Sequence, residues 1–237
     1  MAKTNITVII SAYNEEDNIK ECVLSARALT RDIIVIDTES VDKTASIATL
    51  LGTRVISFPY SRIVEPSRKF SIERARGPWV FLLDADERIT HELVREIRQA
   101  ILSDECSYYK IPRKNLFGRT KWLKHGGWWP DHVLRLINKK YFVDWPARIH
   151  APPKIKGSQG RLNEPIIHFS EGNLSAMVRK TTVFEDVESG LLYKAQKYAS
   201  VATFFRKFLG ELFRRLILWR GFLDGPAGVI GSIYQAY

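Results

Sequence analysis

Three acidic residues that end a run of apolar residues are the most chemically suggestive feature of this sequence. Asp84, Asp86 and Glu87 follow the segment 79–83, whose composition predicts a strand buried on both faces. Because Asp84 and Asp86 alternate across an extended backbone, one can anchor the turn or a ribose while the other meets Mg²⁺ or Mn²⁺. A divalent ion held by one or two carboxylates and by substrate phosphates is typical of nucleotide diphosphate sites. The alternative is a solvated turn before a helix capped by Thr90.

Two further loops carry side chains suited to a nucleotide. The loop 13–16 contains Tyr13, whose ring can stack on a base, and the loop 37–40 begins with Asp37, which can accept from a base N–H. Arg68, on a predicted helix before the acidic strand, can meet a phosphate or the base edge. Taken alone, Tyr13 fits a packing residue as well as a base-stacking one, and Arg68 fits a solvated charge on a helix as well as a phosphate ligand. Their combination in this order favours a nucleotide site.

The elements that must position these loops alternate between strand and helix. Apolar β-forming runs predict strands, and segments with helical spacing separate them. The strands are 6–10, 33–36, 54–58 and 79–83, and the helices are 17–29, 42–51 and 66–76. Such alternation predicts an α/β fold with a doubly wound, mainly parallel sheet and helices on both faces. Because ligands bind at the carboxyl ends of parallel strands, we expect the three loops at one edge of the sheet.

The order of three motifs resembles that of family 2 glycosyltransferases, which are inverting enzymes of the GT-A (Rossmann-like) fold. The motifs are Val8–Glu16, Ile34–Asp37 followed by Ser40 and Asp42–Thr44, and Leu82–Glu87. The resemblance implies a nucleotide diphosphate sugar as donor, expected to be a UDP-sugar such as a UDP-hexose, and Mg²⁺ or Mn²⁺ as the metal. It implies that the nucleotide is held by Ser11, Tyr13, Glu15, Asp37 and Arg68, that Asp84 contacts the ribose or uracil side, and that Asp86 binds the metal.

Three later segments carry a finer likeness, to small bacterial lipopolysaccharide core β-glucosyltransferases: Gly126–Asp131, Arg135 and Arg220–Gly225. This likeness implies acceptor contacts from Trp128, Trp129 and Arg135, although paired tryptophans are as readily core anchors. A run of basic residues between 113 and 125 is either a solvated face or a lip that attracts an anionic acceptor or the donor diphosphate.

An inverting transfer needs a general base for the attacking hydroxyl, and here the sequence departs from the family. Relatives carry an acid in a Glu-Asp or His-Glu pair, whereas this chain has Arg148, Ile149, His150 and Ala151 at the matching place. Two substitutes are available: Asp131, after the Gly-Gly-Trp-Trp-Pro turn, and His150, a residue type that exchanges protons near neutral pH. The simpler interpretation of Asp131 is a turn residue that accepts backbone N–H bonds, and that of His150 is a half-buried histidine with no role in catalysis.

Composition points to an anionic partner and to a membrane surface. The 237 residues carry a net charge of +10 and are 45% apolar, which suffices for one packed α/β domain with an appendage. The segment 201–220 places Phe and Leu at helical spacing beside Arg and Lys, a pattern typical of amphipathic helices in a membrane interface. We expect a catalytic domain at 1–170 and a C-terminal helical, membrane-associating region at 171–237. The alternatives for these helices are packing on the catalytic domain or a homodimer.

The function expected from these residues is metal-dependent transfer of a sugar to a membrane-associated glycan or lipid-linked acceptor in cell-envelope polysaccharide synthesis. Two cysteines, no secretory signal at the start and no long uncharged run favour the cytoplasmic face of the inner (plasma) membrane. The alanine at 151 keeps two alternatives open: a polyprenyl-phosphate glycosyltransferase, whose acceptor needs little help from a base, and a non-catalytic nucleotide-sugar-binding protein. Nucleic acid is not an expected partner, since net charge alone favours it.

Overall fold

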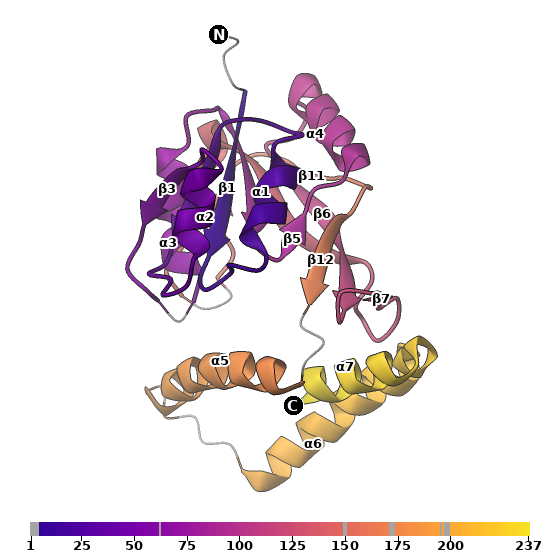
Figure 1. Ribbon diagram of the computed structural model, residues 1–237. Helices are drawn as coiled ribbons and strands as arrows, with labels where there is room; N and C mark the ends of the chain where they lie inside the picture. The colour runs from indigo at the N-terminus through magenta and orange to yellow at the C-terminus, as the bar shows by residue number, and fades with distance from the viewer. Residues whose placement is uncertain (1–4, 62, 149–150, 171–173, 195, 197–199) are drawn as a thin grey trace. The chain divides into compact units, whose positions relative to one another are not determined.

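The expected parallel sheet forms the first half of the protein. The computed structural model describes residues 5–61, 63–148, 151–170, 174–194, 196 and 200–237. Four strands lie in the order β3-β2-β1-β4, and each adjacent pair is parallel (Figure 1). Their bounds are β1 (Ile6–Ala12), β2 (Ile33–Asp37), β3 (Arg54–Ser57) and β4 (Trp79–Asp84). Their carboxyl ends therefore meet at one edge of the sheet.

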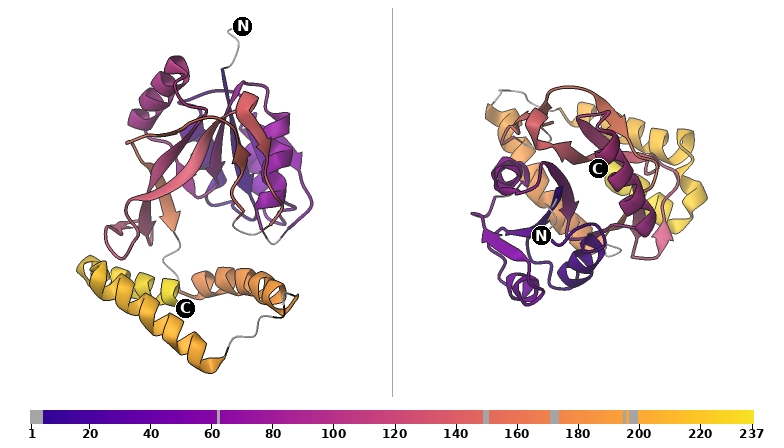
Figure 2. Two further views of the ribbon diagram at one scale, coloured as in Figure 1. Left: turned by 180° about the vertical axis from the view of Figure 1, so that it is seen from behind. Right: turned by 90° about the horizontal axis from the view of Figure 1, so that it is seen from above.

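Helices cover both faces of this sheet and give it two apolar cores (Figures 1 and 2). Val8 and Ile10 pack with α1, α2 and α4, whereas Ile9 packs on the other face with α3, because side chains alternate across a strand. The helices are α1 (Ile19–Ala26), α2 (Thr44–Leu50), α3 (Glu65–Arg74) and α4 (His91–Ser103). The first three are shorter than the sequence predicted. The expected α/β fold with helices on both faces is confirmed.

Beyond β4 the sheet becomes mixed. Strand β8 runs antiparallel to β4, and the order continues β8-β6-β12-β5, so that ten strands form one sheet in the part of the chain that the structure describes. The added strands are β5 (Glu87–Arg88), β6 (Tyr108–Phe117), β7 (Lys121–Trp122), β8 (Asp131–Asn138), β11 (Gln159–Arg161) and β12 (Ile166–Ser170). A separate two-stranded sheet consists of β9 (Phe142–Asp144) and β10 (Lys154–Ile155).

The chain divides into two compact units. The first comprises Met1–Pro112 and His132–Ile167, and the second comprises Arg113–Asp131 and His168–Tyr237. The chain passes from one unit to the other within β6, at the start of β8 and within β12. The sequence placed a single boundary at residue 170. The structure instead groups the segment 113–131, expected in the catalytic domain, with the C-terminal helices.

The second unit is mainly helical. It contains α5 (Leu174–Lys194), α6 (Val201–Phe213), a π-helical turn (Arg214–Leu218), a 3₁₀ turn (Gly221–Asp224) and α7 (Pro226–Ala236). Helix α7 packs closely against the 3₁₀ turn at Gly228, where a side chain would not fit: an added Cβ would lie 2.0 Å from the carbonyl oxygen of Gly221. A hydrogen bond of 2.7 Å from Thr181 Oγ1 to the Tyr234 hydroxyl joins α5 to α7. None of the helices, over their described residues, is long and apolar enough to cross a membrane.

Candidate active site

The carboxyl edge of the parallel sheet brings together three of the predicted nucleotide-binding residues. In the strand register Ser11 lies beside Asp84, and the next residue of β1, Ala12, lies beside Asp37. β1 is therefore the central strand of this edge, with the acid of β2 on one side and the acid of β4 on the other. The candidate site is built on strand ends, which are rigid supports.

Two loops above this edge are fastened to each other by backbone-to-side-chain hydrogen bonds. The amide of Asn14 donates to Ser40 Oγ at 2.9 Å, and the amide of Val41 donates to Asn14 Oδ1 at 2.9 Å. The amide of Glu15 donates to Thr44 Oγ1 at 2.7 Å. Asn14 has a φ of +52°, a left-handed conformation that asparagine tolerates better than most residues. These bonds explain why the motif residues Asn14, Ser40 and Thr44 occur together.

Asp37 offers a buried acceptor atom at the end of β2. Its residue is 6% exposed, Oδ2 accepts a hydrogen bond of 3.3 Å from the Ser40 amide, and Oδ1 has no hydrogen-bond partner among the described residues. A buried carboxylate oxygen without a partner is costly unless a ligand supplies a donor. This geometry suits the predicted contact with a base N–H.

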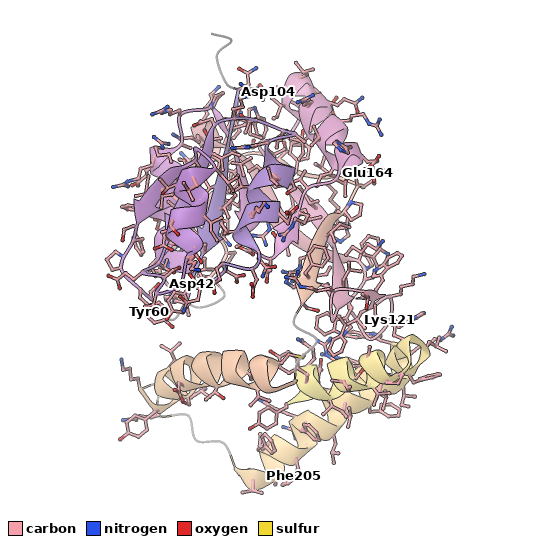
Figure 3. All side chains as sticks on the ribbon, viewed as in Figure 1. Asp42, Tyr60, Asp104, Lys121, Glu164 and Phe205 are labelled. Atoms are coloured by element: carbon pink, nitrogen blue, oxygen red, sulfur yellow. The ribbon has the colours of Figure 1, made fainter. Side chains whose placement is uncertain are left out.

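An aromatic pair lies at the same end of the first unit. The rings of Tyr13 and Tyr60 are 4.5 Å apart at 37°, and both side chains are exposed (Figure 3 labels Tyr60). The amide of Tyr60 donates to Glu39 Oε2 at 3.0 Å, which ties the second ring to the β2–α2 loop. Sequence reasoning identified Tyr13 but missed Tyr60, because no motif or spacing linked Tyr60 to the other loops. The predicted stacking of Tyr13 on a base therefore concerns a pair of exposed rings and not one ring alone.

A buried ion network fixes the end of β4. Arg68 Nη2 lies 2.7 Å from Asp84 Oδ1, while Arg135 Nη2 lies 2.5 Å from Asp84 Oδ2 and 2.6 Å from Glu87 Oε1. Glu87 is fully buried, and its Oε2 accepts a hydrogen bond from the Asp84 amide at 3.1 Å. The two arginine residues are only 4% and 5% exposed. The network therefore connects α3, β4, β5 and β8.

This network determines the charge of its members. Burial alone would raise the pKa of Asp84, but the charges of Arg135 and Arg68 and their hydrogen bonds outweigh it and hold that pKa far below its ordinary value. Burial alone would lower the pKa of Arg135, but Asp84 and Glu87 raise it instead. Arg135, which the sequence likeness assigned to the acceptor, lies in this network beside the predicted nucleotide residues Asp84 and Arg68.

Asp86 is the remaining acid of the motif and lies half-buried in the turn between β4 and β5. Among the described residues, no group of three or more His, Cys, Asp or Glu side chains could hold a metal ion by itself. A single carboxylate such as that of Asp86 would suit an ion that takes its other oxygens from a bound diphosphate and water, which is how Mg²⁺ is commonly held. It does not fit an ion held by the protein alone.

The second unit contains Asp131, one of the two candidate bases, at the start of β8. Arg113 donates to Asp131 Oδ2 through Nε at 2.8 Å and Nη2 at 2.6 Å, and Asn115 Nδ2 donates to the same oxygen at 3.2 Å. His168 Nδ1 lies 2.6 Å from Asn115 Oδ1. Oδ1 of Asp131 accepts no hydrogen bond from the described residues, so that one oxygen is fixed while the other is available. The other candidate base, His150, lies outside the described residues.

The turn that precedes Asp131 is anchored from the C-terminal end of the chain. The buried carboxylate of Asp224 accepts hydrogen bonds from the amides of Lys124 and His125 at 2.7 and 2.8 Å, and lies 2.9 Å from His125 Nδ1. The Gly126 amide donates to the carbonyl oxygen of Trp219 at 2.8 Å. These contacts bring together two of the three segments of the finer likeness, Gly126–Asp131 and Arg220–Gly225, through residues in or next to them. Sequence reasoning quoted Asp224 within its motif but gave it no role, since a contact over 100 positions leaves no local pattern.

The two predicted acceptor tryptophans have different surroundings. Trp128 is half-buried beside α7, where its Nε1 would lie 3.1 Å from a Cβ added to Gly231. Trp129 meets the ring of Trp122 edge to face, with centroids 5.4 Å apart. Trp128 therefore anchors the turn to the helices, while Trp129 belongs to an aromatic pair on the hairpin β6–β7.

The fold agrees with comparisons to known proteins. Residues 7–152 match the family model described as Glycosyl transferase family 2, and the chain belongs to this family. It is thus a glycosyltransferase with a GT-A-like fold, as the motifs indicated.

Relatives match over nearly the whole chain. An uncharacterised glycosyltransferase of Rickettsia conorii is 26% identical over 98% of this chain and 86% of its own length. The lipopolysaccharide core biosynthesis glycosyltransferase LpsC of Rhizobium meliloti is 26% identical over 99% of this chain and 91% of its own length. Among solved structures, S. aureus TarS 1-349 in complex with UDP-GlcNAc covers 98% of this chain at 16% identity, with 79% of TarS 1-349 covered and a TM-score of 0.56. The structure of Mycobacterium tuberculosis glucosyl-3-phosphoglycerate synthase with Mn²⁺ and UDP-Glc matches 84% of this chain and 82% of its own chain at 18% identity, with a TM-score of 0.53.

The ion network at β4 gives a testable stability prediction. Replacing Arg135 by Met leaves Asp84 and Glu87 without their shared cation, and we expect a loss of about 3–5 kcal/mol at neutral pH. Arg135 helps to depress the pKa of Asp84 in the folded state. The difference in unfolding free energy between the wild type and the Arg135→Met variant is therefore largest above the unfolded-state pKa of about 4, and it declines as the pH falls below that value. Urea denaturation at pH 7 measures the loss, and a series continued from pH 7 down to about pH 2 measures its decline in acid.

The matched control is Arg95→Met, which removes an exposed arginine paired only with Glu92 on α4. We expect a change of at most about 0.5 kcal/mol at any pH. Equal losses in the two variants would mean that the network is not a stabilising element.

Proposed function

We propose that this glycosyltransferase uses a nucleotide diphosphate sugar, with a UDP-hexose as the first donor to test. The observation that carries the proposal is the edge formed by β1, β2 and β4. This edge offers the unpartnered Asp37 Oδ1 for a base N–H, the Tyr13–Tyr60 pair for stacking, and Asp86 beside a charge-compensated Asp84. The UDP-sugars named in the TarS and glucosyl-3-phosphoglycerate synthase complexes support the choice of uridine.

The residues of this chain divide the donor chemistry among them. Asp37 and the tyrosine pair hold the base, while Arg68 and Arg135 keep Asp84 ionised and in place for a ribose hydroxyl. Asp86 is the ligand for Mg²⁺ or Mn²⁺, in keeping with the Mn²⁺ in the glucosyl-3-phosphoglycerate synthase complex. When bound, the metal ion offsets the negative charge that develops on the departing diphosphate.

Two donor-side variants separate base recognition from metal binding. We expect Asp37→Ala to weaken UDP binding both with and without Mn²⁺, because the base loses its acceptor. Asp86→Asn keeps the shape of the side chain and removes only the gain in affinity that Mn²⁺ adds, and turnover falls by at least about 100-fold. Calorimetric titration with UDP and a UDP-release assay measure these effects.

Asp17→Asn, which removes an exposed acid of the β1–α1 loop, serves as the control and should leave both measurements unchanged. If the Asp86 variant kept the Mn²⁺ effect and full turnover, the metal would lie elsewhere and this donor site would be wrong.

For the acceptor side we propose Asp131 as the general base. Arg113 and Asn115 hold Oδ2, so Oδ1 is the oxygen that takes the proton of the attacking hydroxyl as the new glycosidic bond forms. Single displacement with such a base inverts the anomeric centre. At the family's usual place for the base, the carbonyl oxygen of Ala151 accepts a hydrogen bond from Trp145 Nε1 at 3.0 Å, and the alanine supplies no carboxylate.

The two candidate bases predict different kinetics. If Asp131 is the base, Asp131→Asn lowers kcat by about 100- to 10,000-fold and leaves the affinity for UDP within twofold, because only proton transfer is impaired. His150→Ala then has little effect. The reverse pattern would assign the base to His150. Steady-state kinetics with saturating donor, combined with UDP titrations, distinguish the two.

A second candidate reaction follows from Ala151. A lipid phosphate is already ionised and needs little base catalysis, so a polyprenyl-phosphate acceptor is compatible with the missing carboxylate. Product analysis decides between them, since one reaction forms a sugar–phosphate–lipid and the other forms a glycosidic bond between sugars. Unimpaired turnover in both base variants would favour the lipid phosphate.

We further propose that the second unit binds the anionic cytoplasmic surface of the plasma membrane and that the acceptor is a membrane-associated glycan or lipid of the cell envelope. The exposed residues of α6 include apolar Phe205 and Leu209 beside Arg206 and Lys207. Such a combination is typical of interfacial helices, in which apolar side chains enter the headgroup layer and cations attract anionic lipid. The envelope role named for LpsC supports the same assignment.

The membrane proposal predicts a loss of vesicle binding in a variant of α6. Phe205 and Leu209 are 53% and 58% exposed, so Phe205→Ser with Leu209→Ser should spare the fold (Figure 3 labels Phe205). We expect binding to phosphatidylglycerol-containing vesicles to weaken by about tenfold per residue, since each substitution removes a large apolar side chain from the interface. Flotation with such vesicles measures it.

The control is Leu102→Ser, which changes an 80% exposed leucine on α4 of the first unit. Equal binding by the control and the α6 variant would contradict the proposal. If the α6 variant instead changed only the sedimentation of a dimer, the helices would be a subunit interface.

A further inference from the structure

One face of the hairpin β6–β7 carries two cations on a single aromatic ring. Lys114 Nζ lies 4.5 Å from the centroid of the Trp122 ring, and Lys124 Nζ lies 4.5 Å from the same centroid. Lys114 comes from β6, and Lys124 follows β7, so the ring is approached from two strands. All three residues belong to the second unit.

The strand register explains this arrangement. Leu116 pairs with Trp122, and the amide of Leu123 donates to the carbonyl oxygen of Asn115 at 3.0 Å. Side chains alternate along each strand, so Lys114, Trp122 and Lys124 share one face. Asn115 and Leu123, on the opposite face, are fully buried. The lysines therefore occupy the outer face of the hairpin.

No described carboxylate neutralises these two ammonium groups. Neither Lys114 nor Lys124 forms an ion pair within the described residues, although Asp131 and Asp224 belong to the same unit and are engaged by Arg113 and His125. Like charges on neighbouring strands repel each other, and the cation–π attraction of Trp122 offsets only part of that cost. An anion between the two ammonium groups would relieve the repulsion.

A second tryptophan ring lies against the ring that the lysines share. Trp129 meets the Trp122 ring edge to face at 84°, and it precedes Asp131 by two residues. Tryptophan faces pack against the apolar C–H groups of a pyranose ring, while cations beside them bind its charged substituents. The group thus combines aromatic rings suited to sugar stacking with cations suited to anion binding, in the same unit as Asp131.

We propose that Lys114, Trp122 and Lys124 form a subsite for an anionic group of the acceptor, a carboxylate or phosphate on a sugar of the acceptor glycan. This inference rests on the proposed function, since it names the class of acceptor for the same enzyme. The subsite recognises the acceptor and not the donor, and it selects acidic glycans over neutral ones.

The test measures binding of defined sugars to the full chain by saturation-transfer NMR titration. The probes are digalacturonic acid with its dimethyl ester, in which each carboxylate is replaced by a neutral methyl ester, and mannose 6-phosphate with mannose. We expect the acidic member of at least one pair to bind at least tenfold more tightly than its neutral partner. The pair that does so identifies the anion as carboxylate or phosphate.

Three substitutions locate the effect. Lys114→Gln and Lys124→Gln should each weaken the acidic probe by about tenfold, as expected for the loss of one charge-assisted contact. Lys121→Gln removes the same charge from the same hairpin, but Lys121 is exposed at the tip and neighbours Trp122 in sequence, so its side chain points to the other face (Figure 3 labels Lys121). It should leave the affinity within twofold.

Four results would overturn the inference. The first is equal affinity for the acidic and neutral members of both pairs, and the second is an equal loss of affinity with Lys121→Gln. The third is a parallel loss of UDP affinity in the Lys114→Gln and Lys124→Gln variants, and the fourth is that these variants lose binding to anionic vesicles and keep their affinity for acidic sugars. The first two indicate diffuse charge, the third a donor contact, and the fourth a lipid contact. UDP titration of the wild-type chain tests the proposed function separately, because a protein that binds acidic sugars but not UDP fails only there.

Discussion

The candidate donor site depends on a charge balance buried at the end of β4. Arg68 and Arg135 contribute two positive charges, and Asp84 and Glu87 contribute two negative charges, so the network as a whole is neutral. Burying an ion costs several kcal/mol unless it is compensated; Arg68, Arg135 and Glu87 are buried, Asp84 is partly exposed, and every member has an oppositely charged partner. The network also spans α3, β4, β5 and β8. The position of the β4–β5 turn is therefore fixed by the same interaction that makes its charges tolerable.

This balance gives the three acids of the motif different tasks. Three bare carboxylates within four residues would repel an approaching diphosphate. Because Asp84 and Glu87 are already compensated by arginine, Asp86 is the acid of the motif whose charge is directed at a ligand in the proposed mechanism. One carboxylate is enough when a metal ion takes further oxygens from the donor. In the proposed mechanism the protein would bind the metal strongly only together with the nucleotide, so that substrate and metal binding would be coupled.

The sequence predicted what local patterns encode. Alternating apolar runs and helical spacing were sufficient for the parallel sheet, and the strand ends followed from it, so Ser11, Asp37 and Asp84 were correctly expected at one edge. Patterns of this kind could not reveal partners distant along the chain. Arg135 pairs with Asp84 across 51 positions, and Asp224 anchors Lys124 across 100. The helix ends were also overestimated, because apolar spacing continues through turns such as Ala28–Leu29 that cover the core without being helical.

In the second unit, three of the described acids have partners within the unit, while several lysine and arginine side chains are exposed. Asp131 is held against Arg113, Asp224 is buried against His125 and two amides, and Glu211 pairs with Arg214 and Arg215. The positive charge that remains is displayed on the hairpin, at Lys114 and Lys124, and on α6, at Arg206 and Lys207. These four cations are part of the excess of Lys and Arg that gives the whole chain its net charge of +10, and they lie on the surfaces proposed for an acidic glycan and for anionic lipid. An acidic glycan anchored in an anionic membrane presents negative charge from its sugars and from the surrounding lipids at once. A single basic unit is suited to bind both.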